Sequence, residues 1–400
     1  MDYISAKEAS EKWQVHIRVV QDYCKQGRIP QARKYGVSWM IPADVCKPHD
    51  LRKKAASASP YTLPRKCPEL IFTTLYNTPG SGSSVAQSLY SDPQAQALFA
   101  CQLAYFRGQT SGAKAAAQEL LNRTDRTDVQ LGCLFTLALC AMYEGDVPLW
   151  LNTSRLLEQL PCPAPEIEAQ RDFQLANISS GLYDEKGFPG WLCDGCFDPL
   201  PIDCFPLARL IYLKYLLISK GNPGISPICI PFISQCRAEG ALLAEIYCLI
   251  LTAIGFHDRG DSEKAAELLD TAIKKALPDR LYSPFAEYRS EFGVLLDERL
   301  EAADKSALSA VRELHKRLLS GWGVLCREVR GVKYTDNLTQ RERHAAKLAA
   351  KGLTNAEIAE RMNVSINSVK RYISEIIGKT GAPNRDAIAD YIALTGETVP

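Results

Sequence analysis

The sequence predicts a mainly α-helical protein built from several units. Three observations lead to this fold class. Residues 352–381 have the pattern of two short helices joined by a tight turn, residues 4–44 have a similar pattern, and the long segment between them repeats a glycine-containing turn after apolar helices. The expected organisation is a winged helix-turn-helix over residues 1–46, a flexible basic linker over 47–68, a helical repeat domain over 69–330 and a second helix-turn-helix domain over 333–400.

The C-terminal helix-turn-helix pattern rests on the spacing of apolar residues. A second helix over Ile366–Lys379 is predicted because every third or fourth residue from Ile366 to Ile376 is apolar. Asn355 stands where the preceding short helix needs an N-cap. In such a motif the second helix lies in the major groove of DNA. On periodicity alone, a basic helix face is more often a solvated surface, so that alternative stays open at this point.

Residues 338–385 resemble the LuxR-type DNA-binding domain. The matching residues follow the family pattern with nearly gap-free spacing: Leu338-Thr339, Arg341-Glu342-Arg343, Gly352-Leu353-Thr354-Asn355, Glu357-Ile358-Ala359, Val364-Ser365, Ser368-Val369-Lys370, Ile376, Lys379 and Asn384-Arg385. The resemblance implies a four-helix domain in which Ile366–Lys379 is the recognition helix. Two positions depart from the family, since Tyr372 replaces a histidine and Thr380 replaces a leucine. We expect Tyr372 to alter site preference and Thr380 to weaken one core contact.

The resemblance also implies which side chains meet DNA. Basic side chains suit guanine acceptors and phosphate oxygens. The residues expected at base edges are Lys370, Arg371 and Ser374. Those expected near phosphates are Thr354, Ser365 and Ser368. The polar face of the recognition helix also carries two further expected DNA contacts, Asn367 and Lys379. The fourth helix, about Arg385–Leu394, carries apolar residues that fit either a homodimer contact or the domain's own core: Ile388, Tyr391 and Ile392.

The N-terminal segment has its own start and stop signals. Ser5 and Glu8 form a capping box at the start of a first helix, and a second helix is predicted from about His16 to Lys25 with Gly27 as its breaker. A basic turn and a short strand over Val37–Ile41 follow. Residues 4–44 resemble the MerR/excisionase group of winged DNA-binding domains, and these residues carry the likeness: Ile4-Ser5, Glu8-Ala9, Trp13, Val15, Val19, Gly27-Arg28-Ile29-Pro30 and Ser38-Trp39-Met40-Ile41-Pro42.

In that group the second helix reads the major groove and the wing reaches the backbone or the minor groove. The resemblance therefore implies two sets of DNA contacts: His16, Arg18, Gln21 and Asp22 on the helix, and Arg33 and Lys34 on the wing. The alternative is a small winged domain used for protein contact. Residues 47–66 are rich in proline and small or basic residues, which is typical of a linker.

The middle of the chain repeats a turn at nearly constant spacing. Glycines end apolar helices at Gly108, Gly145, Gly221 and Gly260, and Gly181–Gly187 lies where a copy would fall between the second and third. This pattern looks like tetratricopeptide-type helix hairpins, and a non-repeating helical domain is the alternative. Such arrays expose a concave groove, which would take a peptide, a protein or a small-molecule effector. The apolar run over residues 241–256 is expected to be a buried helix.

Charge and composition limit the function classes. Residues 1–66 carry 13 lysines and arginines and 6 acidic residues, whereas residues 67–332 carry 24 lysines and arginines and 32 acidic residues. The ends of the chain can therefore bind a phosphate backbone, and the acidic middle is not suited to it. Cys193-x-x-Cys196 lacks an obvious second ligand pair, so no metal is expected. No cofactor is expected and no catalytic constellation or nucleotide loop occurs, which argues against an enzyme. Without an apolar leader or membrane span, a cytoplasmic bacterial regulator is expected.

Two functions from different classes fit these observations. The first is a sequence-specific transcriptional regulator that binds double-stranded DNA, with the helical repeats as a sensor or partner surface and RNA polymerase as a further partner. The second is a helical-repeat scaffold whose small terminal domains dock proteins. The dense match at residues 338–385 favours the first.

Overall fold

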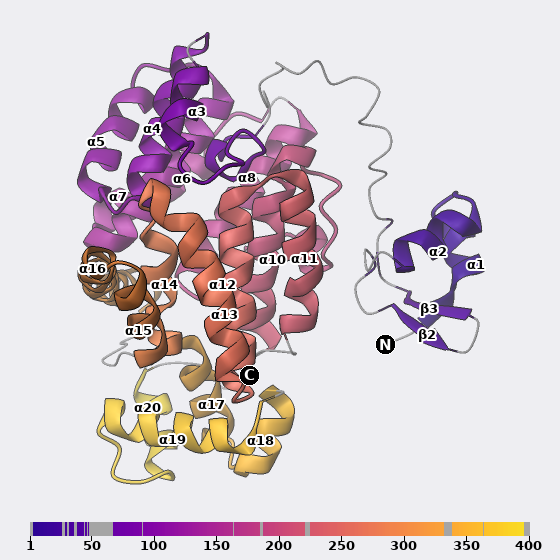
Figure 1. Ribbon diagram of the computed structural model, residues 1–400, viewed down its shortest axis with the longest axis vertical. Helices are drawn as coiled ribbons and strands as arrows, with labels where there is room; N and C mark the ends of the chain where they lie inside the picture. Colours follow the sequence, from indigo (N-terminus) through magenta and orange to yellow (C-terminus); the bar gives the residue numbers. More distant parts are fainter. Residues whose placement is uncertain are drawn as a thin grey trace.

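The computed structural model is mainly helical, and Figure 1 shows its elements along the chain. It describes residues 3–25, 29, 32–35, 38–43, 45, 47, 67–89, 91–162, 164–184, 187–220, 225–331, 338–362 and 364–395. The predicted linker over 47–68, the breaker Gly27 and the turn glycine Gly221 therefore lie wholly or largely outside the described residues.

The N-terminal unit combines two helices with a small sheet. Its elements are β1 (Tyr3–Ser5), α1 (Ala6–Lys12), α2 (Ile17–Lys25), β2 (Arg33–Tyr35) and β3 (Ser38–Pro42). The sheet is antiparallel with order β1-β3-β2, and Ile4 pairs with Ile41. The capping box is confirmed, because the Glu8 amide donates to the Ser5 hydroxyl and Glu8 accepts from the Ser5 amide. Strand β1 was not predicted from the sequence, and α2 begins at Ile17, one residue after the predicted start at His16.

A helical domain follows, and its elements run in this order: η2 (Leu70–Phe72), α3 (Gly82–Ser88), α4 (Pro93–Phe106), α5 (Thr110–Leu121), α6 (Thr127–Glu144), α7 (Val147–Glu158), α8 (Pro165–Gly181), α9 (Gly190–Cys193), η3 (Ile202–Cys204), α10 (Phe205–Lys220), α11 (Ile225–Glu239), α12 (Leu242–Asp258), α13 (Ser262–Ala276), η4 (Leu277–Asp279), α14 (Ser283–Phe292), α15 (Val294–Ala303) and α16 (Lys305–Arg330). Consecutive helices pack against one another from α4 to α8 and from α10 to α13. This packing agrees with helix hairpins, and the tetratricopeptide-type repeat itself stays a prediction.

A glycine–aspartate pair makes two of the sharp turns between these helices. Gly145 and Gly260 have φ values of 65° and 86°, in the left-handed region where a side chain is costly. The next residue caps the following helix, since Asp146 accepts from the Leu149 amide at 3.0 Å and Asp261 from the Lys264 amide at 3.1 Å. The same two-residue device therefore ends one helix and starts the next.

Helix α12 lies in the centre of the domain, as its composition predicts. Every residue from Leu242 to Ile254 is buried, including Glu245. Arg237 and Lys275 offset the charge of that carboxylate, at 2.8 and 3.1 Å. The polar end of α12, at His257 and Asp258, reaches the C-terminal domain.

The C-terminal domain consists of α17 (Gln340–Ala350), α18 (Asn355–Met362), α19 (Ile366–Thr380) and α20 (Ala387–Thr395) around a hydrophobic core of its own. The prediction that Asn355 is the N-cap of α18 is wrong by one residue. Thr354 caps α18 instead, because Glu357 stands three residues after it and completes a capping box. Ile388 and Ile392 of α20 are buried in this core, which supports the second of the two alternatives for the fourth helix.

Only a short stretch of chain joins the helical domain to the C-terminal domain. Helix α16 ends at Arg330, Gly331 caps it in the left-handed conformation, and α17 begins at Gln340. Within the described part of the chain, no helix has the length and apolar composition required to cross a membrane.

Candidate nucleic-acid interface

Helix α19 presents the face that was expected to read DNA. Ser365 caps the helix by accepting from the Ser368 amide at 3.0 Å. Val369 and Ile376 point into the domain core with no exposed surface. The opposite side carries exposed polar residues: Asn367, Lys370, Arg371 and Ser374. The periodicity therefore placed Val369, Ile373 and Ile376 correctly, whereas Ile366 of the predicted apolar stripe is 48% exposed and Ser368 is buried.

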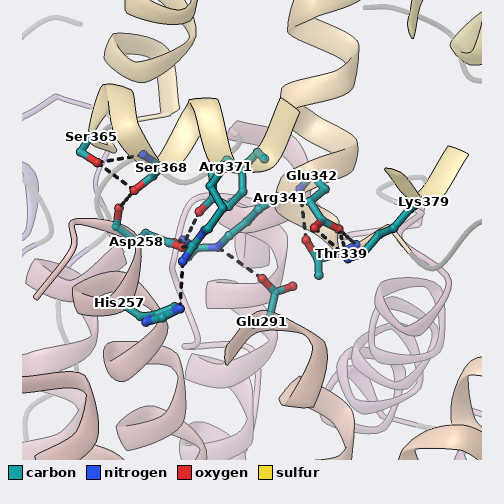
Figure 2. A network of polar contacts seen from close by, with 11 residues as sticks. His257, Asp258, Glu291, Thr339, Arg341, Glu342, Ser365, Ser368, Arg371 and Lys379 are labelled. Carbon is teal, nitrogen blue, oxygen red and sulfur yellow. Dashed lines mark hydrogen bonds and ion pairs between the residues drawn. The ribbon is translucent and has the colours of Figure 1, made fainter. Parts of the chain in front are cut away.

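Part of that polar face contacts the helical domain. Figure 2 shows Asp258, the last residue of α12, with Ser368, Arg371 and Arg341 around it. The Ser368 hydroxyl donates to the Asp258 carbonyl, and the Tyr372 hydroxyl donates to its carboxylate. Arg341 forms an ion pair with the same carboxylate, and Arg371 lies 3.8 Å from it. We call these five residues the Asp258 cluster.

The Asp258 cluster removes its charged groups from water. Asp258 is 1% exposed and Arg341 is 4% exposed, whereas the Arg371 side chain keeps 43% of its surface. Arg341 also lies 3.9 Å from Glu291 at the end of α14. Buried charges are stable only when they are paired, so the cluster depends on all its members being present together.

His257 adds a neutral contact next to the cluster. Arg371 Nη1 lies 3.2 Å from His257 Nε2, and arginine can only donate, so this ring nitrogen accepts and the ring is neutral. Burial, together with the nearby charges of Arg371 and Arg341, lowers the pKa of His257 to about 4. The docked arrangement therefore disfavours a proton on His257.

Two more of the predicted C-terminal contacts, Lys379 and Thr354, have partners within the domain. Lys379 lies 2.8 and 2.9 Å from the two oxygens of Glu342, and thus joins α19 to α17. Glu342 also completes a capping box with Thr339. The Thr354 hydroxyl donates to Glu357 at 2.8 Å. These bonds fix the helices that carry the exposed face.

The predicted N-terminal contacts lie on two surfaces of the first unit. His16 and Arg18 are exposed at the start of α2, with Gln21 half-buried one turn further on. Arg33 and Lys34 are exposed on β2, and Lys34 pairs with Trp39 across the hairpin. The unit has two helices followed by the β2–β3 hairpin, while the winged helix-turn-helix and its contact with DNA stay predictions.

The helical-domain side of the Asp258 cluster was not predicted from the sequence. Residues 257–261 were interpreted only as a helix-ending turn, because nothing in their local pattern indicates a partner 114 residues away. One signal was available. Tyr372 departs from the family histidine, and its hydroxyl is the atom that reaches Asp258.

A group of residues other than the Cys193-x-x-Cys196 pair approaches metal-site geometry. Among the described residues, ligand atoms of Cys67, Glu69 and Cys204 lie within 4.8 Å of one another, and all three residues are buried. The Cys67 thiol donates to Glu69 at 3.3 Å, and burial raises the pKa of Glu69 to about 7. A structural zinc ion takes four ligands, so these three residues fit a buried hydrogen-bonded network better than a zinc site.

Comparisons with known proteins agree with the geometry of the C-terminal domain. Residues 336–392 match the family "Bacterial regulatory proteins, luxR family". The DNA-binding transcriptional activator DevR/DosR of Mycobacterium tuberculosis is 28% identical over 162 residues, which are 40% of this chain and 65% of that protein. The "Probable transcriptional regulator ycf29" of Porphyra purpurea is 41% identical over 54 residues, 14% of this chain and 26% of that protein.

The C-terminal domain is therefore a helix-turn-helix domain of the LuxR family. The chain spans between 12% and 65% of the length of the curated relatives it matches. No solved structure matches it. Both of these relatives are named as transcriptional regulators or activators.

Proposed function

We propose that the protein is a sequence-specific transcriptional regulator and that α19 reads the major groove. The observation that supports this most is a LuxR-family helix-turn-helix whose recognition helix keeps an exposed polar face at Asn367, Lys370 and Ser374. Lysine and arginine on such a face suit guanine edges and phosphates. The acidic helical domain would serve as the regulatory part and not as a DNA surface.

The conformation described here is one that excludes DNA from part of α19. Ser368 is buried against α12, and Arg371 is held between His257 and Asp258. A recognition helix contacts base edges with its N-terminal residues, and Ser368 and Arg371 belong to that half of α19. We infer that the C-terminal domain leaves the Asp258 cluster before it binds a specific site. The helical domain then controls DNA binding by how firmly it holds α19.

Replacing Lys370 by alanine should weaken binding to the selected site by about 1–3 kcal/mol, because Lys370 is exposed on α19 and would contact a base edge. The measurement is selection of DNA from a random pool by the full-length protein, followed by titration of the enriched site at fixed salt. Lys305→Ala is the matched control, since that lysine is exposed on α16 and distant in sequence from α19.

Three outcomes of this experiment are informative. An equal loss on random DNA would reassign Lys370 to phosphate contact. A loss in the Lys305→Ala control as well would indicate a general charge effect. Failure to enrich DNA would count against the regulator if it occurred both in the full-length protein and in a variant whose Asp258 is replaced to release the C-terminal domain. If the protein then captured a protein partner instead, the scaffold function would replace the regulator.

Deleting residues 1–46 should shorten the DNA footprint of the full-length protein. The deletion removes the exposed cations of α2 and β2, at Arg18, Arg33 and Lys34. A second contact would also make binding more salt-sensitive, so the deletion should reduce the slope of affinity against salt. Hydroxyl-radical footprinting measures the first effect and a salt titration the second. A footprint and a salt slope that match those of the full-length protein would leave the N-terminal unit with a role in protein contact.

A further inference from the structure

A cavity lies where the helical domain meets the start of the C-terminal domain. Its volume is about 110 Å³, and α6, α8, α10, α14 and α16 contribute to its walls. Much of the wall is apolar, with Met142, Leu318 and Trp322 among its members. Leu338 and Thr339, the first described residues of the C-terminal domain, complete it. The cavity therefore exists in this form only while the two domains are docked.

Most polar groups in the cavity wall already have partners. Glu287 accepts from the hydroxyls of Tyr247 and Tyr105, at 3.0 and 3.4 Å. His315 donates from Nδ1 to the Ala286 carbonyl at 2.7 Å, so its Nε2 accepts from the Ser290 hydroxyl at 2.9 Å. These bonds leave a neutral imidazole and a well-ordered carboxyl group beside the cavity.

Lys214 differs from these groups. Its half-buried side chain lines the cavity from α10, and within the described ranges it makes no hydrogen bond and no ion pair. Burial raises the pKa of Glu287, while Lys214 acts on that carboxyl from a distance and opposes the shift. An ammonium group that is partly removed from water gains most from a charged acceptor in direct contact. A carboxylate is a common small group that supplies such a charged acceptor.

We propose that this cavity binds a small monocarboxylic acid, with Lys214 as the partner of the carboxylate and the apolar wall as the partner of its hydrocarbon part. The size limits the ligand to a single ring or a short chain, because an engineered cavity of about 150 Å³ accepts benzene. Burial raises the pKa of Glu287, which reduces the repulsion between its carboxyl group and the incoming anion.

The position of the cavity gives the direction of the effect on DNA binding, and this part rests on the proposed function. A ligand that touches Leu338 and Thr339 makes those contacts only in the docked state. It therefore binds that state more tightly and shifts the population toward it. The wall residue Glu291 also faces Arg341 of the Asp258 cluster. The acid would thus act as an inhibitor of DNA binding, and DNA would weaken binding of the acid by the same factor.

The test is calorimetric titration of the full-length protein with benzoate, phenylacetate, butyrate and hexanoate, each compared with its primary amide. At least one acid should bind ten times more tightly than its amide, which has nearly the same shape and no charge. Lys214→Met should lose that preference. Lys316→Met should retain it, because Lys316 is exposed on α16 beside the cavity residue His315. Thermal unfolding of both variants checks that they are folded.

The outcomes separate this proposal from the proposed function. If all four acids fail to bind, or bind no better than their amides, the carboxylate site is overturned. The same holds if Lys214→Met binds the acid as well as the unaltered protein does. If the acid binds through Lys214 but leaves the affinity for a selected DNA site unchanged, the coupling is overturned and the site stands. If no variant binds DNA, the regulator function fails while the calorimetric result is unaffected.

Discussion

Replacing Asp258 by alanine raises the affinity of the full-length protein for its DNA site by ten- to a hundredfold. In the docked state the substitution removes the nearer carboxylate partner of Arg341, which is 4% exposed, and leaves only Glu291 at 3.9 Å. Removing one partner of a buried ion pair costs about 3 kcal/mol, and each 1.4 kcal/mol changes a population ratio tenfold. In the released state Arg341 is in water, so its charge carries no burial cost. The substitution therefore favours release of the domain that binds DNA.

Fluorescence anisotropy at fixed salt and pH measures this effect. Glu267→Ala is the matched control, because Glu267 is an exposed acidic residue on the neighbouring helix α13. Asp258→Asn should give a smaller rise than Asp258→Ala, since the amide keeps an acceptor for Tyr372 and loses only the charge. Equal affinities for the unaltered protein and for Asp258→Ala, with equal protection of α19 in hydrogen exchange, would show that the Asp258 cluster does not restrain DNA binding.

Lowering the pH from 7.5 to 5.5 should raise the affinity for DNA by up to roughly tenfold. Docking holds the pKa of His257 at about 4, so the docked state takes up no proton in this range. In the released state His257 approaches its ordinary pKa of about 6.5 and gains a proton as the pH falls below that value. The state that binds more protons is stabilised by acid, so release is favoured between about pH 6.5 and pH 4.

The charged groups around His257 also predict that protonation favours release of the C-terminal domain. Arg371 and Arg341 face it from the C-terminal domain, the ring of Phe292 lies 6.0 Å away on α14, and Asp258 follows it on α12. A proton on His257 would therefore meet two guanidinium groups and displace the hydrogen bond from Arg371. His257→Gln keeps an acceptor that cannot titrate in this range, and its pH profile should be flat.

A second histidine provides the control for the pH experiment. His16 is exposed at the start of α2 and was predicted to contact DNA, so its own protonation would also strengthen binding. His16→Gln should keep the acid response if His257 is responsible. If instead the response disappears in His16→Gln and persists in His257→Gln, the proton acts at the N-terminal unit and not at the docked interface.

Local patterns predicted the elements of the C-terminal domain well. The apolar residues of α19 repeat at the helical period, and that period determines which face enters the core. The error at the start of α18 has an equally local cause. Thr354 and Asn355 are both good N-cap residues, and the bond from Glu357 back to Thr354 decides between them.

Contacts between distant segments could not be predicted in the same way. Strand β1 is three residues long and has no alternation to recognise, and only its pairing with β3 defines it. Asp258 resembles any acidic residue at a helix end until α19 is placed against it. Lys214 is similar, because its unusual surroundings come from helices far apart in the sequence. The face of the reading helix was therefore predictable, whereas its docking partner and the cavity were not.

The short connection after α16 has a consequence for how release depends on concentration. The chain from Gly331 to Leu338 can span at most about 25 Å when fully extended. A domain tethered this closely meets its docking surface at an effective concentration on the order of millimolar, whatever the amount of protein present. Dilution therefore does not open the molecule, and contacts too weak to hold two separate proteins suffice to keep it closed. The open fraction then reports proton activity and ligand level rather than copy number, and stays the same in a cell that makes few molecules or many.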